Sequence, residues 1–132
     1  MSNERSMNTT QDHKEAAIEF LCLVANGKVR EAFGKHISPE FRHHNPYFQG
    51  DGESLMIAME ENAGLHPDKI LEIQRALQDG DLVAVHSRVR LKPNDLGLAL
   101  VHIFRFKENL IVELWDIGQA APENSPNKCG MF

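Results

Sequence analysis

The sequence predicts a single α+β domain in which helices cover one face of an antiparallel sheet. In the first half of the chain, apolar residues recur at three- and four-residue spacing, which indicates amphipathic helices. From Ile70 onward they alternate with a period of two, which indicates strands. Helices gathered first and strands gathered last are typical of the α+β class. The chain has 132 residues, enough for one domain with its own core.

Three helices are expected, each followed by residues that break a helix. The pair Asn26-Gly27 ends the first, the pair Ser38-Pro39 ends the second, and Gly64 ends the third. The expected bounds are about 12–26, 29–36 and 53–62.

Four strands follow the helices, and residues 41–47 are expected to be extended or irregular. That segment, FRHHNPY, has no helical periodicity and contains a proline. The turn at 79–81 is Asp-Gly-Asp and the three-residue link at 107–109 ends in Asn, both typical of hairpins. The expected strands are 70–78, 82–91, 98–106 and 110–117.

Composition argues against nucleic-acid and membrane partners. The formal net charge is -5, and the 14 Lys and Arg residues are scattered instead of forming the basic stripe that phosphates require. No apolar run approaches the roughly 18 residues of a membrane span. Glycine-rich phosphate loops and other common catalytic motifs are absent from the sequence.

The first ten residues are polar and are expected to be flexible, with one domain over residues 11–132. They lack the apolar region of a secretory signal, and Thr10 or Asp12 can cap the first helix. Cys22 and Cys129 are the only cysteines and do not suggest a disulfide framework. A reducing compartment, the cytoplasm, is therefore expected.

The last hairpin brings polar side chains onto an apolar face. If the turn pairs Phe106 with Leu110, His102 lies opposite Leu114. A face that is apolar except for one histidine and one carboxylate is typical of a ligand pocket. The side chains expected on this face include Leu100, His102, Phe104, Val112, Leu114 and Asp116.

The preceding hairpin decides where His86 points. If Arg90 pairs with Leu98, His86 lies opposite His102 on the pocket face. A slip of one residue would send His86 to the other face.

Five segments resemble a known family by their order and spacing, although none is specific alone. They are His44-Asn45-Pro46 in HHNPY, DLVAVHSRV with His86, HIFRF at 102–106, VELWDIGQ at 112–119, and the ending NKCGMF. Together they resemble the SnoaL-like polyketide cyclases of the nuclear transport factor 2-like superfamily. The ending also resembles a subgroup described as predicted aldol-condensation enzymes.

The resemblance implies a cone-shaped, cystatin-like fold with a strongly curved sheet, a pocket between sheet and helices, and a dimer. It implies a pocket carboxylate that acts as acid or base on a polyketide carbon, without metal or organic cofactor. Asp116 stands at that position. The chain departs from the subgroup at His102, where Asp is usual, and at Leu114, where His is usual.

The candidate functional residues follow from these two lines of reasoning. Asp116 is the expected general base for proton abstraction next to a carbonyl, and His102 and His44 are the other expected catalytic residues. His102, His86, His44 or Tyr47 would stabilise an enolate oxygen. The remaining residues expected to bind a small hydrophobic carbonyl compound are Leu100, Phe104, Leu114 and Gln119.

Two other functions stay open. The same pocket can hold a small molecule without turnover, in which case the protein is a binding module. A hydrolase would need a second carboxylate on the pocket face, and none is assigned there.

No metal is expected, because the adjacent His43 and His44 make a poor chelate. Apolar residues Ile103, Trp115 and Ile117 on the other sheet face predict a homodimer.

Overall fold

The structure, a computed structural model, describes residues 12–132; the segment 1–10 that was expected to be flexible lies outside the described residues. Its helices are α2 (His13–Ala25), α3 (Val29–His36) and α4 (Gly52–Leu65), and its strands are β1 (Ile37–His43), β2 (Ile70–Asp79), β3 (Leu82–Arg90), β4 (Leu98–Lys107) and β5 (Leu110–Ala120). No helix of the described part is long and apolar enough to cross a bilayer.

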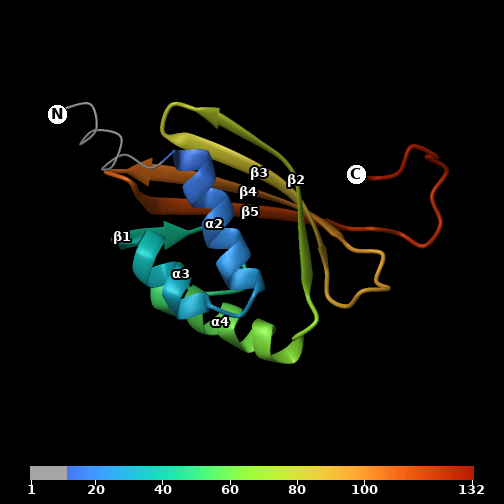
Figure 1. Ribbon diagram of the computed structural model, residues 1–132, viewed down its shortest axis with the longest axis horizontal. Coiled ribbons are helices and arrows are strands. Elements are labelled where there is room, and N and C mark those ends of the chain that lie inside the picture. Colours follow the sequence, from blue (N-terminus) through green and yellow to red (C-terminus); the bar gives the residue numbers. More distant parts are fainter. Residues whose placement is uncertain (1–11) are drawn as a thin grey trace.

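The five strands form one curved sheet in the order β1-β5-β4-β3-β2. Figure 1 shows α2 lying against the sheet, with α3 and α4 grouped beyond it near β1. The sheet is mixed instead of purely antiparallel, because β1 pairs with β5 in parallel. Part of the segment expected to be extended or irregular therefore belongs to an edge strand. Pro39 lies within β1, and an edge strand tolerates a proline because the missing N–H is not needed for pairing.

The first two helices have the expected bounds because their local signals agree with their packing. The Asp12 side chain accepts a hydrogen bond from the Lys14 N–H at 2.8 Å and caps α2. Gly27 has a φ of +84° just after this helix, a conformation that glycine adopts without strain. Phe20 is fully buried on the apolar face of α2 and contacts Phe33 of α3.

The third helix runs past its expected end at Asn62. The Asp51 side chain accepts a hydrogen bond from the Ser54 N–H at 2.9 Å and caps its start. At the other end the His66 N–H donates to the Asn62 carbonyl at 3.0 Å. Gly64 therefore lies inside the helix and not after it, which a helix tolerates at about 1 kcal/mol.

The last hairpin is offset by two residues from the expected register. Glu108 and Asn109 both have positive φ, so they form a two-residue turn, and a bulge follows between Arg105 and Phe106. The result pairs His102 with Asp116. An offset of two keeps both side chains on the expected face, because side chains alternate.

The preceding hairpin has the one-residue slip, so the expected pairing of Arg90 with Leu98 is wrong. Leu98 pairs with Val89 and His102 pairs with Val85, which places His86 on the opposite face. The buried valines at 83, 85 and 89 explain this register, because they must all face the helices.

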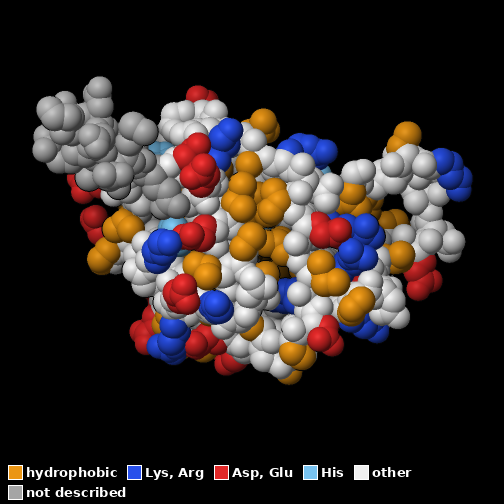
Figure 2. Space-filling model, viewed as in Figure 1, with side chains coloured by type: hydrophobic (Ala, Val, Ile, Leu, Met, Phe, Trp, Pro, Cys, Tyr) orange, Lys and Arg blue, Asp and Glu red, His pale blue; other side chains and the backbone are white. Residues whose placement is uncertain are grey.

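The two faces of the sheet have different surroundings. The inner face packs on the helices through a core of Ala16, Ala17, Phe20, Leu21, Val29, Ala32, Phe33, Phe41, Leu55, Val83, Val85, Phe104, Phe106, Ile111 and Leu114. Figure 2 shows apolar side chains gathered between α2 and β2, with acidic and basic side chains spread around them.

Candidate functional site

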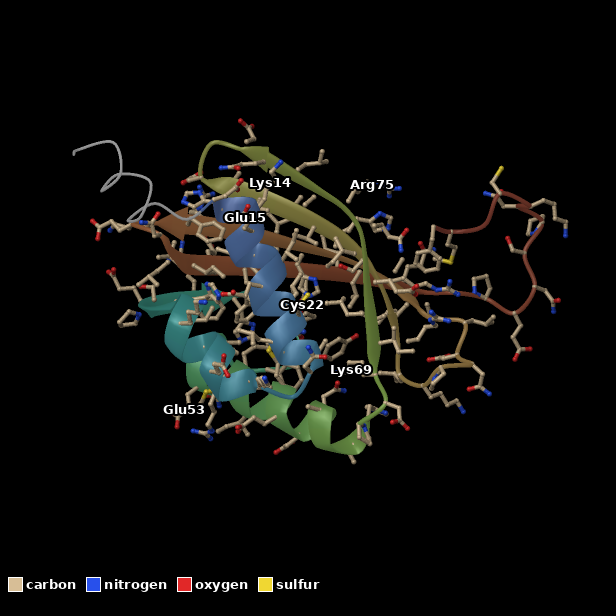
Figure 3. The ribbon with its side chains drawn as sticks, in the orientation of Figure 1. Lys14, Glu15, Cys22, Glu53, Lys69 and Arg75 are labelled. Atoms are coloured by element: carbon tan, nitrogen blue, oxygen red, sulfur yellow. The ribbon has the colours of Figure 1, made fainter. Side chains whose placement is uncertain are left out.

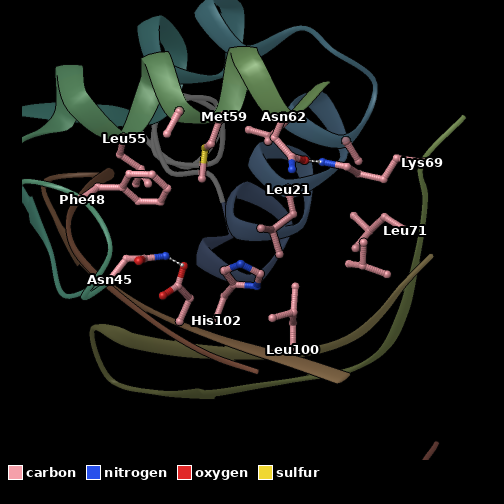
Figure 4. A pocket seen from close by; sticks show the side chains of 15 residues that line it. Leu21, Asn45, Phe48, Leu55, Met59, Asn62, Lys69, Leu71, Leu100 and His102 are labelled. Carbon is pink, nitrogen blue, oxygen red and sulfur yellow. Dashed lines mark hydrogen bonds between the residues drawn. The ribbon is translucent and has the colours of Figure 1, made fainter. Parts of the chain in front are cut away.

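A cavity of about 220 Å³ lies between the helices and the inner face of the sheet (Figure 4). Most of its wall is apolar, contributed by Leu21, Val24, Ala25, Phe48, Leu55, Ala58, Met59, Leu71, Val89 and Leu100. Its polar side chains are Asn45, Asn62, Lys69, His102 and Asp116. A mostly apolar cavity with a few converging polar groups is the usual form of a small-molecule site.

His102 and Asp116 face each other across β4 and β5, at the floor of this cavity. His102 is only 7% exposed, and its Nδ1 atom has no hydrogen-bond partner in the described part of the chain. Burial lowers the pKa of His102 to about 4, although the nearby charge of Asp116 acts in the opposite direction. At neutral pH the imidazole is therefore uncharged and can donate one hydrogen bond and accept another.

Asn45 holds Asp116 in place. Its Nδ2 donates to Asp116 Oδ2 at 3.1 Å, and its Oδ1 accepts from the Tyr47 N–H at 3.0 Å. The Tyr47 N–H can only donate, so it fixes which way the Asn45 amide is turned. The His44 N–H, which donates to the Leu114 carbonyl at 3.0 Å, ties this segment to β5. The other oxygen of Asp116 has no hydrogen-bond partner among residues 12–132.

Asn45, Phe48 and the second polar end of the cavity were not expected from the sequence. His44 and Tyr47 were expected from HHNPYF, whereas Asn45 and Phe48 line the cavity. For Asn45 the available signal was alternation, since the neighbour of an outward side chain in an extended segment points inward. Phe48 lies at the end of a turn at residues 46–48, where alternation does not hold. Lys69 and Asn62 form the second end, and no pattern in the sequence distinguishes them from surface residues.

Three of the expected site residues line the cavity, namely Asp116, His102 and Leu100. Phe104 and Leu114 lie on the same sheet face but are fully buried in the core and do not line it.

The other expected site residues lie elsewhere. Tyr47 is 84% exposed and Gln119 is also exposed near the end of β5. His86 interacts with Arg75 on the outer face of the sheet, so the expectation that it faces the pocket is wrong. His44 also lies on the outer face, where its ring stacks on Trp115 with centroids 5.0 Å apart.

Glu113 is the centre of a charged cluster on this outer face. It accepts hydrogen bonds from Arg42 Nε at 3.0 Å and pairs with His44 Nε2 at 2.6 Å. Arg105 Nε lies 3.4 Å from its other oxygen. The hydrogen bonds from His44 and Arg42 lower the pKa of Glu113. Each oxygen of this carboxylate thus faces a guanidinium group, Arg42 on one and Arg105 on the other, which is typical of a structural ion cluster.

The cavity suits acid–base chemistry at carbon. Asp116 is its one carboxylate among the described residues, so the second carboxylate that the hydrolase hypothesis needs is missing from this wall. Within residues 12–132, no three His, Cys, Asp or Glu side chains converge as a metal site would require. His102 lies opposite Asp116 and not opposite Leu114, so the expected pairing of positions 102 and 114 is wrong.

A sequence profile of the SnoaL-like domain matches residues 17–114 of the chain. No match was found among functionally curated proteins.

Several solved structures share the fold. Wild-type IdmH, "a putative polyketide cyclase" from Streptomyces antibioticus, has 17% identity and a TM-score of 0.69, covering 83% of this chain and 93% of that chain. A "putative ketosteroid isomerase" from Kribbella flavida has 21% identity and a TM-score of 0.67, covering 88% and 84%. A nuclear transport factor 2-like protein from Cytophaga hutchinsonii has 16% identity and a TM-score of 0.67, covering 83% and 93%. These likenesses confirm the expected fold class.

Proposed function

Since the chain belongs to the SnoaL-like domain family, we propose that it is a cofactor-independent cyclase or isomerase of that type. The reaction begins with removal of a proton from the carbon next to a carbonyl of a small hydrophobic substrate. The observation that carries this proposal is the facing pair of His102 and Asp116 in an apolar cavity. His102 Nδ1 and the second carboxylate oxygen of Asp116 have no hydrogen-bond partner among residues 12–132.

Each polar group has a distinct role in the proposed reaction. The free oxygen of Asp116 accepts the proton, and the electron pair of the broken C–H bond becomes the enolate. His102 donates a hydrogen bond to the enolate oxygen, where negative charge develops. Asn45 is a positioning residue, because it acts by holding the other oxygen of Asp116.

The enolate then has two outcomes. In a cyclase its carbon attacks a second carbonyl of the same molecule, forming a C–C bond, and the new alkoxide takes the proton that Asp116 accepted. In an isomerase Asp116 returns the proton to a different carbon of the conjugated system. Neither route requires an oxidant or another reactant, and the apolar wall keeps water away from the reactive carbon.

The test is deuterium exchange from D₂O into small apolar ketones, propiophenone among them, followed by NMR. The Asp116→Asn variant keeps the side-chain shape but loses the proton acceptor, so exchange should fall roughly a hundred- to ten-thousand-fold. Asp81→Asn makes the same chemical change at an exposed turn residue and should exchange at the wild-type rate.

An exchange rate that survives Asp116→Asn would contradict the assignment of the base. If the wild-type protein binds these ketones without exchanging them, the binding-module alternative is correct.

Two further expectations from the sequence remain part of the proposal. Ile117 is 63% exposed on the outer face, beside the partly exposed Ile103 and Trp115, and pairing of two copies there would cover them. Light scattering at micromolar concentration should find a dimer, and a monomer alone would contradict it. A cytoplasmic location is proposed for the same protein.

A further inference from the structure

The cavity contains a cation that the proposed acid–base chemistry does not use. Lys69 follows the turn after α4, where its N–H donates to the His66 carbonyl at 3.2 Å. Its ammonium group donates to Asn62 Oδ1 of α4, and both side chains line the cavity. Figure 3 shows Lys69 at the start of β2, beside the helices, and Figure 4 shows its contact with Asn62.

The charge of Lys69 has no compensating carboxylate in the described part of the chain. Eight ion pairs are formed there, and Lys69 is in none of them. Burial lowers the pKa of Lys69 below its ordinary value of 10.5, with no neighbouring anion to raise it again. A partly buried ammonium without a counter-ion is costly, and an anionic ligand would remove that cost.

The donors at this end of the cavity are suited to a carboxylate. An ammonium group has three donors, and Asn62 accepts only one of them. Because Asn62 turns its oxygen toward Lys69, its amide nitrogen is free to donate as well. Together they offer one positive charge and several N–H donors, which match a singly charged group with two acceptor oxygens.

This second polar end is separated from the first by apolar side chains. Figure 4 shows Lys69 and Asn62 on one side of the cavity and Asn45 on the other, with Leu21 and Leu100 between them. Since an apolar cavity of about 150 Å³ holds a benzene ring, the 220 Å³ here has room for roughly one ring and a short chain.

We propose that Lys69 and Asn62 form a carboxylate subsite, so that the substrates are small apolar keto acids. The carboxylate binds at Lys69, the apolar part fills the middle, and the ketone lies at His102 and Asp116. The position of the ketone rests on the proposed function, whereas the carboxylate subsite stands on its own geometry.

The experiment compares two probes, 3-(4-acetylphenyl)propanoate and its carboxamide, in which the ring lies between the ketone and the end group and only the charge of that end group differs. Calorimetry on the wild-type protein should show the carboxylate binding about tenfold more tightly than the amide. Lys69→Met, which keeps the chain length without charge, should bind both equally. Lys69→Arg should retain a preference for the carboxylate. Melting temperatures check that each variant is folded.

The wild-type comparison decides the matter even if a variant fails to fold. Equal binding of both probes, or binding of neither, would overturn the subsite. An unchanged preference in Lys69→Met would also overturn it. So would a covalent adduct between the ketone and Lys69 that borohydride reduction traps, because the amine would then act as a nucleophile. Asp116→Asn should keep the carboxylate preference. If the wild-type protein shows the carboxylate preference but does not exchange the ketone, the proposed function is wrong and the subsite stands.

Discussion

The two faces of strands β4 and β5 each carry a carboxylate with a histidine nearby, yet their surroundings are opposite. On the outer face, Glu113 is in contact with Arg42, His44 and Arg105. On the inner face, Asp116 has one neutral donor, Asn45, and faces a histidine that burial keeps neutral. Both oxygens of Glu113 are therefore in contact with positively charged side chains. Asp116 has one oxygen without a hydrogen-bond partner among residues 12–132.

This difference explains why residue type alone does not identify a catalytic site. A carboxylate surrounded by cations is a weak base, because each cation favours its ionised form. A carboxylate in an apolar cavity with an unused oxygen is available to a substrate proton. The inner pair is therefore the one that we propose to react, and the outer cluster ties the edge strand β1 to β5 through Arg42.

The largest expected difference between the faces is in how the stability of the fold depends on pH. Folding lowers the pKa of His102 from 6.5 to about 4, so the unfolded chain binds its proton more readily than the folded one. The stability from this group is fully present above pH 6.5 and is lost as pH falls toward 4, a loss of about 3 kcal/mol. Urea unfolding at a series of pH values measures it.

The matched variant for this measurement is His102→Phe, which keeps an aromatic ring beside Phe104 but does not titrate. It should lose the decline between pH 6.5 and 4, apart from what other groups contribute. An identical decline in wild type and variant would show that His102 is protonated equally in both states.

A smaller effect is expected at the outer face, and on stability instead of activity. Glu113→Gln replaces a charged acceptor by a neutral amide and should destabilise the fold by about 2 kcal/mol. Because the pKa of Glu113 is lowered, this contribution should be present above pH 4.5 and decline as pH falls below it. Ketone exchange should stay near the wild-type rate. A rate loss comparable to that of Asp116→Asn would break the distinction between the faces.

The smallest effect is expected for His44→Gln. The side chain of His44 is 43% exposed, and its loss should cost about 1 kcal/mol or less. Exchange should remain within about twofold of wild type, because the residue lies outside the cavity. A much larger loss in an exchange assay would restore His44 to the catalytic role that the sequence analysis gave it.

Local signals predicted the elements well because they act over short distances. The cap at Asp12 and the stop at Gly27 depend on neighbouring residues only, and α2 has the expected bounds. The helix around Gly64 shows the limit, since α4 continues through a residue that was expected to end it, up to the hydrogen bond from the His66 N–H to the Asn62 carbonyl.

Strand register was less predictable because pairing depends on distant residues. The turn at Glu108 and Asn109 and the bulge that follows shifted β5 by two residues from Glu113 onward, which kept Asp116 on the predicted face and brought it to His102. Before the bulge the shift is one residue, so Ile111 faces the core and the expectation that Val112 does so is wrong. A shift by one between β3 and β4 moved His86 away from the cavity. A register shift of two residues leaves the side chains on the predicted face of the sheet, whereas a shift of one residue moves them to the opposite face.

The sequence by itself determined the α+β class, the three helices, the four long strands and the inward position of His102, Leu100 and Asp116. These follow from hydrophobic periodicity, which each segment carries alone. Only the tertiary structure decided that Asn45 holds Asp116, that Glu113 collects the outer cations, and that Lys69 reaches the cavity. Each of these contacts joins segments distant in the chain, where the angle and offset of packing decide which polar atoms meet.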